Sequence, residues 1–150
     1  MRFETYLAEK VSQYAGVKGF HLKDHFPNWQ VCWYVMINDD VEVRHRMAGG
    51  VHATYNNCLK NGTSVVTGHL HAAQVTRYTD RRGTRYGVDN GMIAERDGQQ
   101  FLDYTEARAT NWREGFTELT FIDGVLMPPA LVEVLDDGSV WVTNGQRITV

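Results

Sequence analysis

The sequence has few of the residues that mark secreted, disulfide-bonded or membrane-embedded proteins. Only two cysteines occur among its 150 residues, Cys32 and Cys58, and their spacing favours neither a disulfide framework nor a thiolate zinc site. No stretch approaches the run of about 18 apolar residues that a membrane-spanning helix needs. The charged N-terminus also lacks the apolar region of a signal peptide. We therefore expect a cytoplasmic protein without membrane contact.

A surplus of positive charge is also missing. Lysine and arginine together number 15 against 18 acidic residues, which gives a formal net charge of −3. Nucleic-acid binding through bulk charge is therefore not indicated, whereas a small phosphate ester remains a compatible substrate. The length and the 43% hydrophobic content predict a single domain over residues 1–150.

Hydrophobic periodicity predicts two main helices, over residues 3–14 and 51–60. In the second helix, the predicted buried stripe consists of Val51, Tyr55, Cys58 and Leu59. A polar loop is expected over residues 95–113. These helices and the many short apolar runs predict an α+β fold, an α/β sandwich that is rich in strands.

Short β-branched and aromatic runs between turn residues predict the strands. The run 29–37 is predicted to be a mostly buried strand, and a prolyl pair at 128–129 indicates an edge position or a bulge. The remaining strands are expected at 41–45, 63–67, 73–78, 84–88, 115–121, 125–135, 140–143 and 147–150.

Histidines at the ends of two predicted strands form the candidate metal site. His69 and His71 follow the strand 63–67 directly after Gly68, and His45 ends the strand 41–45. His52 is the competing third ligand. Imidazole binds zinc, manganese, iron or nickel, although two histidines separated by one residue can also share a strand face without any metal.

The residues around these histidines resemble a known family. Thr63-Ser64-Val65-Val66-Thr67-Gly68-His69-Leu70-His71 resembles the closing GHxH motif of the calcineurin-like metallophosphoesterases, and the end of 41–45 resembles their lone-histidine motif. The segments 85–95 and 111–116 are similar to a branch found in phages and bacteria. The resemblance implies the C-terminal half of a four-layer β-sandwich that hydrolyses phosphomonoesters or phosphodiesters. It also implies two divalent ions (Mn, Fe, Zn or Ni) in a complete site, with His45 and His69 on one ion and His71 on the other.

The family's carboxylate motifs are missing from the sequence. Asp-x-His, Gly-Asp-x-x-Asp and Gly-Asn-His-Asp/Glu do not occur before His45, so we interpret the chain as a half-length member whose Met1 falls just after the lost segment. Without carboxylates the repulsion between two cations is uncompensated, and we expect one ion or none and no phosphatase activity from the chain alone. Asp89 and Glu95 are assigned to turn and surface roles.

Loss of half the sandwich would leave an uncovered sheet edge. We therefore expect either a homo-oligomer or a complex with a chain that supplies the N-terminal motifs, in the host cytoplasm if a phage encodes the protein. Two alternatives stay open: a non-catalytic binding or regulatory remnant of the fold, and a truncated gene product.

Three further groups of residues are weighed as functional. Arg77, Arg81, Arg82 and Arg85 near a predicted hairpin turn could contact phosphate, but a solvated hairpin tip is the more ordinary interpretation. Five aromatic residues could stack on bases but are more often packing residues at strand spacing: Trp29, Trp33, Tyr34, Trp112 and Trp141. Asn56 and Asn57 could line a metal cleft or form a polar helix face.

Overall fold

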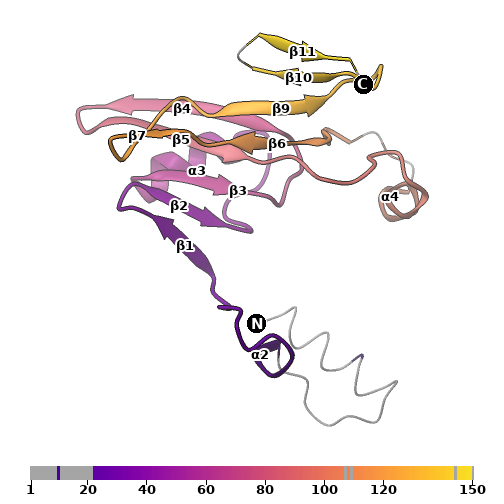
Figure 1. The fold of residues 1–150 in the computed structure, drawn as a ribbon, viewed down its shortest axis with the longest axis horizontal. Helices are drawn as coiled ribbons and strands as arrows, with labels where there is room; N and C mark the ends of the chain where they lie inside the picture. The colour runs from indigo at the N-terminus through magenta and orange to yellow at the C-terminus, as the bar shows by residue number, and fades with distance from the viewer. Residues whose placement is uncertain (1–9, 11–21, 107, 109, 144, 150) are drawn as a thin grey trace. The chain divides into compact units, whose positions relative to one another are not determined.

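The computed structural model describes residues 10, 22–106, 108, 110–143 and 145–149, and Figure 1 shows its fold. The chain forms two compact units, residues 1–33 and 34–150. The first contains α2 (Leu22–His25), a helix of only four residues. Except for Lys10, the helix predicted over residues 3–14 lies outside the described residues. In the described part, no helix has the length and apolar character to span a membrane.

The second unit is built around a mixed five-stranded sheet with the strand order β1-β2-β3-β5-β4. The two edge strands run antiparallel to their neighbours, and β2, β3 and β5 run parallel to one another. Parallel strands end at the same edge of the sheet, so the residues that follow them are brought together. The strands are β1 (Tyr34–Ile37), β2 (Val41–Arg44), β3 (Ser64–Thr67), β4 (Gln74–Asp80) and β5 (Gly83–Asp89).

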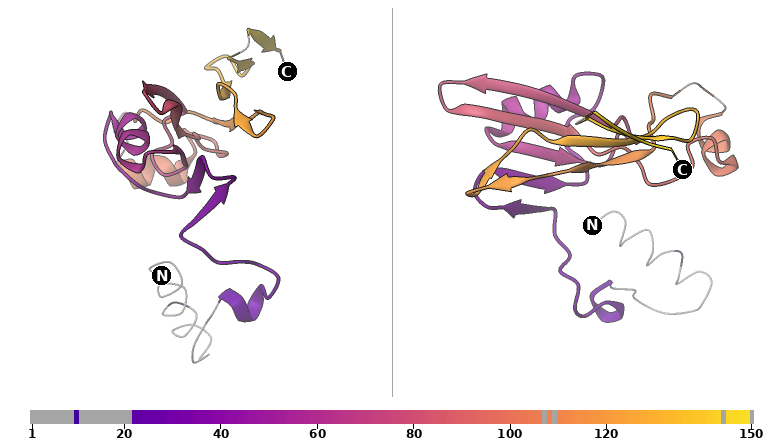
Figure 2. Two further views of the ribbon diagram at one scale, coloured as in Figure 1. Left: turned by 90° about the vertical axis from the view of Figure 1, so that its left-hand side faces the viewer. Right: turned by 45° about the horizontal axis from the view of Figure 1, so that its top comes forward.

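Helix α3 (Ala53–Asn61) covers one face of this sheet, as the views in Figures 1 and 2 show. The helix lies so close that a Cβ added to Gly87 would be 1.8 Å from the carbonyl oxygen of Thr54. Only small or compact polar side chains fit into this contact. The predicted stripe is therefore wrong except for Cys58: three of its members are exposed, and the buried residues are Ala53, Thr54, Asn57 and Cys58.

The opposite face of the sheet carries the hydrophobic core. Val66 and Val88 are direct neighbours across β3 and β5, and they pack with Val41 and Tyr86. The segment after β6 (Gly115–Glu118) covers this core from the other side. Its contributions come from Leu119 and from the small hairpin of β7 (Phe121–Ile122) and β8 (Val125–Leu126), through Phe121 and Leu126.

A second, antiparallel sheet has the order β11-β10-β9-β6. Its later strands are β9 (Ala130–Val134), β10 (Val140–Val142) and β11 (Gln146–Ile148). The prolyl pair 128–129 separates β8 from β9 rather than forming a bulge within one strand. The predicted loop 95–113 contains α4 (Gln99–Thr105), a helix of seven residues. The described chain is therefore α+β and strand-rich, as predicted.

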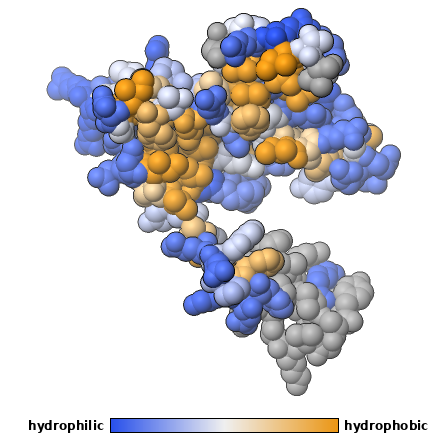
Figure 3. All heavy atoms as spheres, in the orientation of Figure 1, coloured by the Kyte–Doolittle hydropathy of each residue, from blue (hydrophilic) through white to orange (hydrophobic). Residues whose placement is uncertain are grey.

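Strand β1 is the clearest departure from the predicted burial. All four residues of β1 are exposed, although they are apolar or aromatic. Their composition is that of a buried strand, but β1 lies at the end of the sheet order and its side chains lack cover from other described residues. Figure 3 shows apolar atoms gathered near this end of the larger sheet and also over β9 and β10.

Candidate functional site

The ends of the parallel strands β2 and β3 bring His45 and His69 together. The backbone N–H of Gly68 donates to the carbonyl oxygen of His45 at 3.2 Å, which continues the pairing of the two strands beyond their last residues. The imidazole atoms His69 Nδ1 and His45 Nε2 are 3.3 Å apart, with the ring planes at 74°. The structure therefore brings together the two histidines that were predicted to share one ion.

This separation is that of a hydrogen bond between the two rings, and it also equals the spacing of two nitrogens bound to one metal ion. Two nitrogens at about 2.05 Å from a tetrahedral ion lie about 3.3 Å apart, which matches the separation of His69 Nδ1 and His45 Nε2. Burial lowers the pKa of His69, and its neighbours His45, Arg46 and His71 lower it further, against a smaller opposing effect of Asp89. A lowered pKa favours the neutral imidazole, which is the form that binds a metal.

His71 lies in the same loop, but its ring faces a different neighbour. Its backbone has φ 60°, a left-handed conformation that is uncommon for a residue with a side chain. The ring meets Trp112 edge-on with a centroid distance of 4.9 Å. Its Nδ1 is buried without a hydrogen-bond partner, and an unpaired buried nitrogen of this kind is available to a ligand.

The third predicted ligand is therefore not assembled with the first two. Across the described ranges, no group of three or more histidine, cysteine, aspartate or glutamate side chains is close enough to hold one metal ion. His52, the competing candidate, is exposed at the N-cap position of α3 and makes no side-chain capping bond. The geometry supports a two-histidine site with His71 beside it.

Asp89 holds the loop from Gly68 to Ala72, called here the histidine loop because it carries His69 and His71. This finding corrects the assignment of Asp89 to a turn or surface role. The residue is the last of β5 and is fully buried. Its carboxylate accepts the backbone N–H of Ala72 at 2.7 Å and that of Leu70 at 3.1 Å. The Thr67 hydroxyl lies 3.4 Å away. These two amides flank His71 and follow His69, so Asp89 fixes the course of the loop that carries both imidazoles.

Asn57 fixes the course of the loop that follows His45. It is fully buried against the sheet, and its Oδ1 accepts the backbone N–H of Ala48 at 2.8 Å. Its Nδ2 is buried without a hydrogen-bond partner. Of the two predicted asparagines, Asn57 is thus a positioning residue behind the site rather than part of an exposed polar face, whereas Asn56 is only half-buried.

The described residues offer little negative charge to a metal at this place. The carboxylate oxygens of Asp89 already accept the two loop amides, and Glu95 is exposed in the loop before α4. A site of two histidines suits one borderline transition-metal ion such as zinc or nickel better than a pair of ions, because no bridging carboxylate offsets their repulsion.

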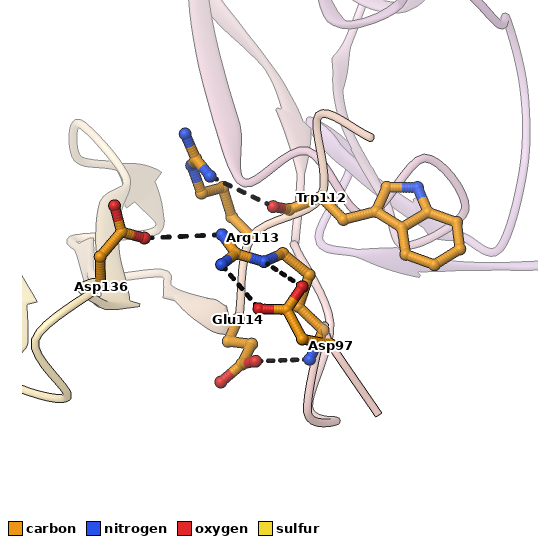
Figure 4. Close-up of polar contacts among 6 residues, drawn as sticks. Asp97, Trp112, Arg113, Glu114 and Asp136 are labelled. Atoms are coloured by element: carbon orange, nitrogen blue, oxygen red, sulfur yellow. Dashed lines mark hydrogen bonds and ion pairs between the residues drawn. The ribbon is translucent and has the colours of Figure 1, made fainter. Parts of the chain in front are cut away.

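Trp112 and α4 form a wall beside His71. The backbone N–H of Arg113 donates to the carbonyl oxygen of His71 at 2.7 Å, so this segment runs alongside the histidine loop. In Figure 4 the indole of Trp112 points away from the carboxylates of Asp97, Glu114 and Asp136. Trp112 thus has a place at the site that composition alone could not assign.

The arginines near the hairpin turn are placed away from the histidines. The turn between β4 and β5 lies at the opposite end of β5 from Asp89. Arg85 is paired there with Asp80 at 2.5 Å, an ion pair that lowers the pKa of the Asp80 carboxyl. The structure therefore favours the solvated hairpin tip for Arg81 and Arg82, which are exposed, whereas the Arg85 side chain is only 11% exposed and lies over the Tyr78 ring.

Comparisons with known proteins give two relatives, both from phages. The chain is 31% identical over 110 residues to the Gene 54 protein of Mycobacterium phage L5 and, equally, to the Gene 54 protein of Mycobacterium phage D29. Each match covers 65% of this chain but only 43% of the relative, so the chain spans less than half the length of either phage protein. No protein-family model and no solved structure matches the chain.

Proposed function

We propose that this chain provides the histidine half of a calcineurin-like metallophosphoesterase site, in the C-terminal part of that family's β-sandwich. The observation that carries the proposal is the 3.3 Å separation of His45 Nε2 and His69 Nδ1 at the ends of two parallel strands. The buried clamp of Asp89 on the loop from Leu70 to Ala72 supports it, because a loop held this firmly presents its imidazoles in a fixed geometry.

The reaction that fits this donor set is the hydrolysis of a phosphomonoester or phosphodiester. A divalent ion bound there would lower the pKa of a water molecule and polarise a phosphoryl oxygen. His45 and His69 would hold the ion, and the unpaired Nδ1 of the neighbouring His71 would meet the phosphate or a second ion. The carboxylates that a complete site needs would have to come from outside the described loops.

The exposed edge of β1 indicates how such carboxylates could be supplied. The strand carries four exposed apolar or aromatic residues and no charge, and exposed apolar edges pair readily with other strands. In purified protein the available partner is a second copy, so we propose antiparallel pairing of two β1 strands.

This pairing would bring acidic residues to the histidine end of the sheet. Tyr34 at the start of β1 pairs with Arg44, the residue before His45, and the turn containing Asp39 and Asp40 lies at the other end of β1. In an antiparallel pair, the second copy's turn would therefore lie beside the start of β1. It would be about 10 Å across the sheet from the end of β2, a gap that an aspartate, a metal ion and a histidine can bridge together.

The test measures mass and turnover on the same samples. With manganese and bis(4-nitrophenyl) phosphate, we expect dimers by light scattering and a turnover per chain that rises with protein concentration as dimers form. Val35→Lys, which places a charge on the free edge, should yield monomers without turnover. Ile93→Lys is the matched control, because Ile93 is 88% exposed away from β1.

Two results would count against the proposal. Turnover that Val35→Lys leaves unchanged would refute the shared site. A dimer that binds metal but never hydrolyses the ester would favour the non-catalytic remnant of the fold.

A further inference from the structure

An aromatic cluster adjoins the histidine loop, and the proposed hydrolysis does not use it. Trp112 is its centre: Phe101 meets it edge-on at 5.5 Å, Tyr104 stacks on it at 6.3 Å with 23° between the planes, and His71 meets it at 4.9 Å. Tyr104 is 78% exposed. Aromatic side chains that stay exposed beside a polar site are suited to stacking a flat ligand.

A hollow of about 340 Å³ lies against this cluster, a size at the lower end of the range of small-ligand sites. Phe101, Leu102 and Trp112 give it apolar walls, and Thr110 adds a hydroxyl group. The Thr105 hydroxyl already donates to the Phe101 carbonyl oxygen at 2.9 Å, so it can only accept a hydrogen bond from a ligand. Hydroxyl groups at the rim of an apolar slot can bond the polar edge of a heterocycle while the aromatic walls stack on its face.

The charges around the hollow argue against a phosphate inside it. Arg96 is paired with Asp97 at 2.9 Å and faces Asp136 at 3.6 Å. Figure 4 labels Asp97 and Asp136 and draws both contacts as dashed lines to the arginine between them. Arg108 is paired with Glu106 at 2.8 Å. Because both arginines already have carboxylate partners, the hollow offers no surplus positive charge, and an anionic group would be better placed at the histidines.

We propose that the aromatic cluster binds the nucleobase of a nucleotide whose phosphate lies at His45, His69 and His71. This inference rests on the proposed function and narrows its substrate class to nucleoside phosphates. His71 joins the two parts, because its ring contacts Trp112 and its carbonyl oxygen accepts the N–H of Arg113. The net charge of −3 favours a single nucleotide over a long nucleic-acid backbone.

The test is calorimetric titration of the full chain with AMP, ribose 5-phosphate and adenosine, each with and without manganese. AMP should bind at least about fivefold more tightly than ribose 5-phosphate, the gain expected from stacking one base. Trp112→Leu should make the two affinities equal, and Phe101→Leu, which alters another wall of the hollow, should bring them closer together. Tyr55→Leu should leave the ratio of the two affinities unchanged, because Tyr55 lies on α3 and its ring contacts Tyr78 of β4.

The probes separate failure of this inference from failure of the proposed function. Equal affinity for AMP and ribose 5-phosphate, together with no binding of adenosine, would overturn the nucleobase site whatever manganese does. Adenosine binding that depends on Trp112 would support it even if manganese left the affinity for every phosphate unchanged, and that second result would count against the metal site alone.

Discussion

Gly87→Ala should destabilise the protein more than an alanine at any other described glycine, because its Cβ makes the closest contact. The new Cβ would lie 1.8 Å from the Thr54 carbonyl oxygen and 2.5 Å from its carbonyl carbon. Both are backbone atoms of α3, so no side-chain rotation relieves the clash and the whole helix has to shift. Overpacking of this kind costs about 3 kcal/mol or more of the free energy of unfolding, and we expect the midpoint of thermal unfolding to fall by roughly 10 °C.

The matched control is Gly49→Ala. A Cβ at Gly49 would meet nothing within 4 Å, so its unfolding midpoint should stay within about 2 °C of the parent. Combining Gly87→Ala with Thr54→Ala should restore nothing, because the clash involves the backbone. An unfolding midpoint of Gly87→Ala equal to that of the control would show that α3 does not approach β5 this closely.

Asp89→Ala should release the histidine loop. The substitution leaves the N–H groups of Leu70 and Ala72 without their acceptor, and each unsatisfied buried donor costs about 1–3 kcal/mol. We expect a loss of about 2–5 kcal/mol in the free energy of unfolding. Amide hydrogen exchange at Leu70 and Ala72 should also become faster.

Two variants sharpen this test. Asp89→Asn keeps one acceptor oxygen and turns the other into a donor that faces a backbone N–H, so it should lose part of the stability and protect only one of the two amides. Asp24→Ala removes an exposed carboxylate and should change neither quantity. Unchanged exchange at both amides in Asp89→Ala would contradict the role of Asp89 as the clamp of the loop.

The sequence located the strands of the site because their signals are local. The β-branched runs at Val41 and Val65 and the following histidines identify β2 and β3 directly, and the structure confirms both strands. The sequence could not separate a buried strand from an exposed edge strand, because Val35 and Ile37 have the composition of either. Helix α4 was missed since seven residues are too few to show a helical period.

The positioning residues depend on tertiary contacts that composition does not reveal. Asp89 stands before Asn90-Gly91, where an acidic residue is typical of a turn. Its burial follows from the parallel pairing of Thr67 with Asp89, which places the carboxylate beneath the loop after β3. Asn57 was ambiguous for a similar reason: the close approach at Gly87 turns the small and polar side of α3 inward, against the usual rule that the apolar stripe is buried.

The most direct test of the account is the metal stoichiometry of the purified chain, measured by elemental analysis after dialysis against limiting zinc or manganese. The account predicts one ion per chain, lost in both His45→Ala and His69→Ala and retained in His52→Ala, because only the first two imidazoles have nitrogens at a coordinating separation. A chain that binds no ion, or one whose ion survives the loss of either histidine, would contradict it.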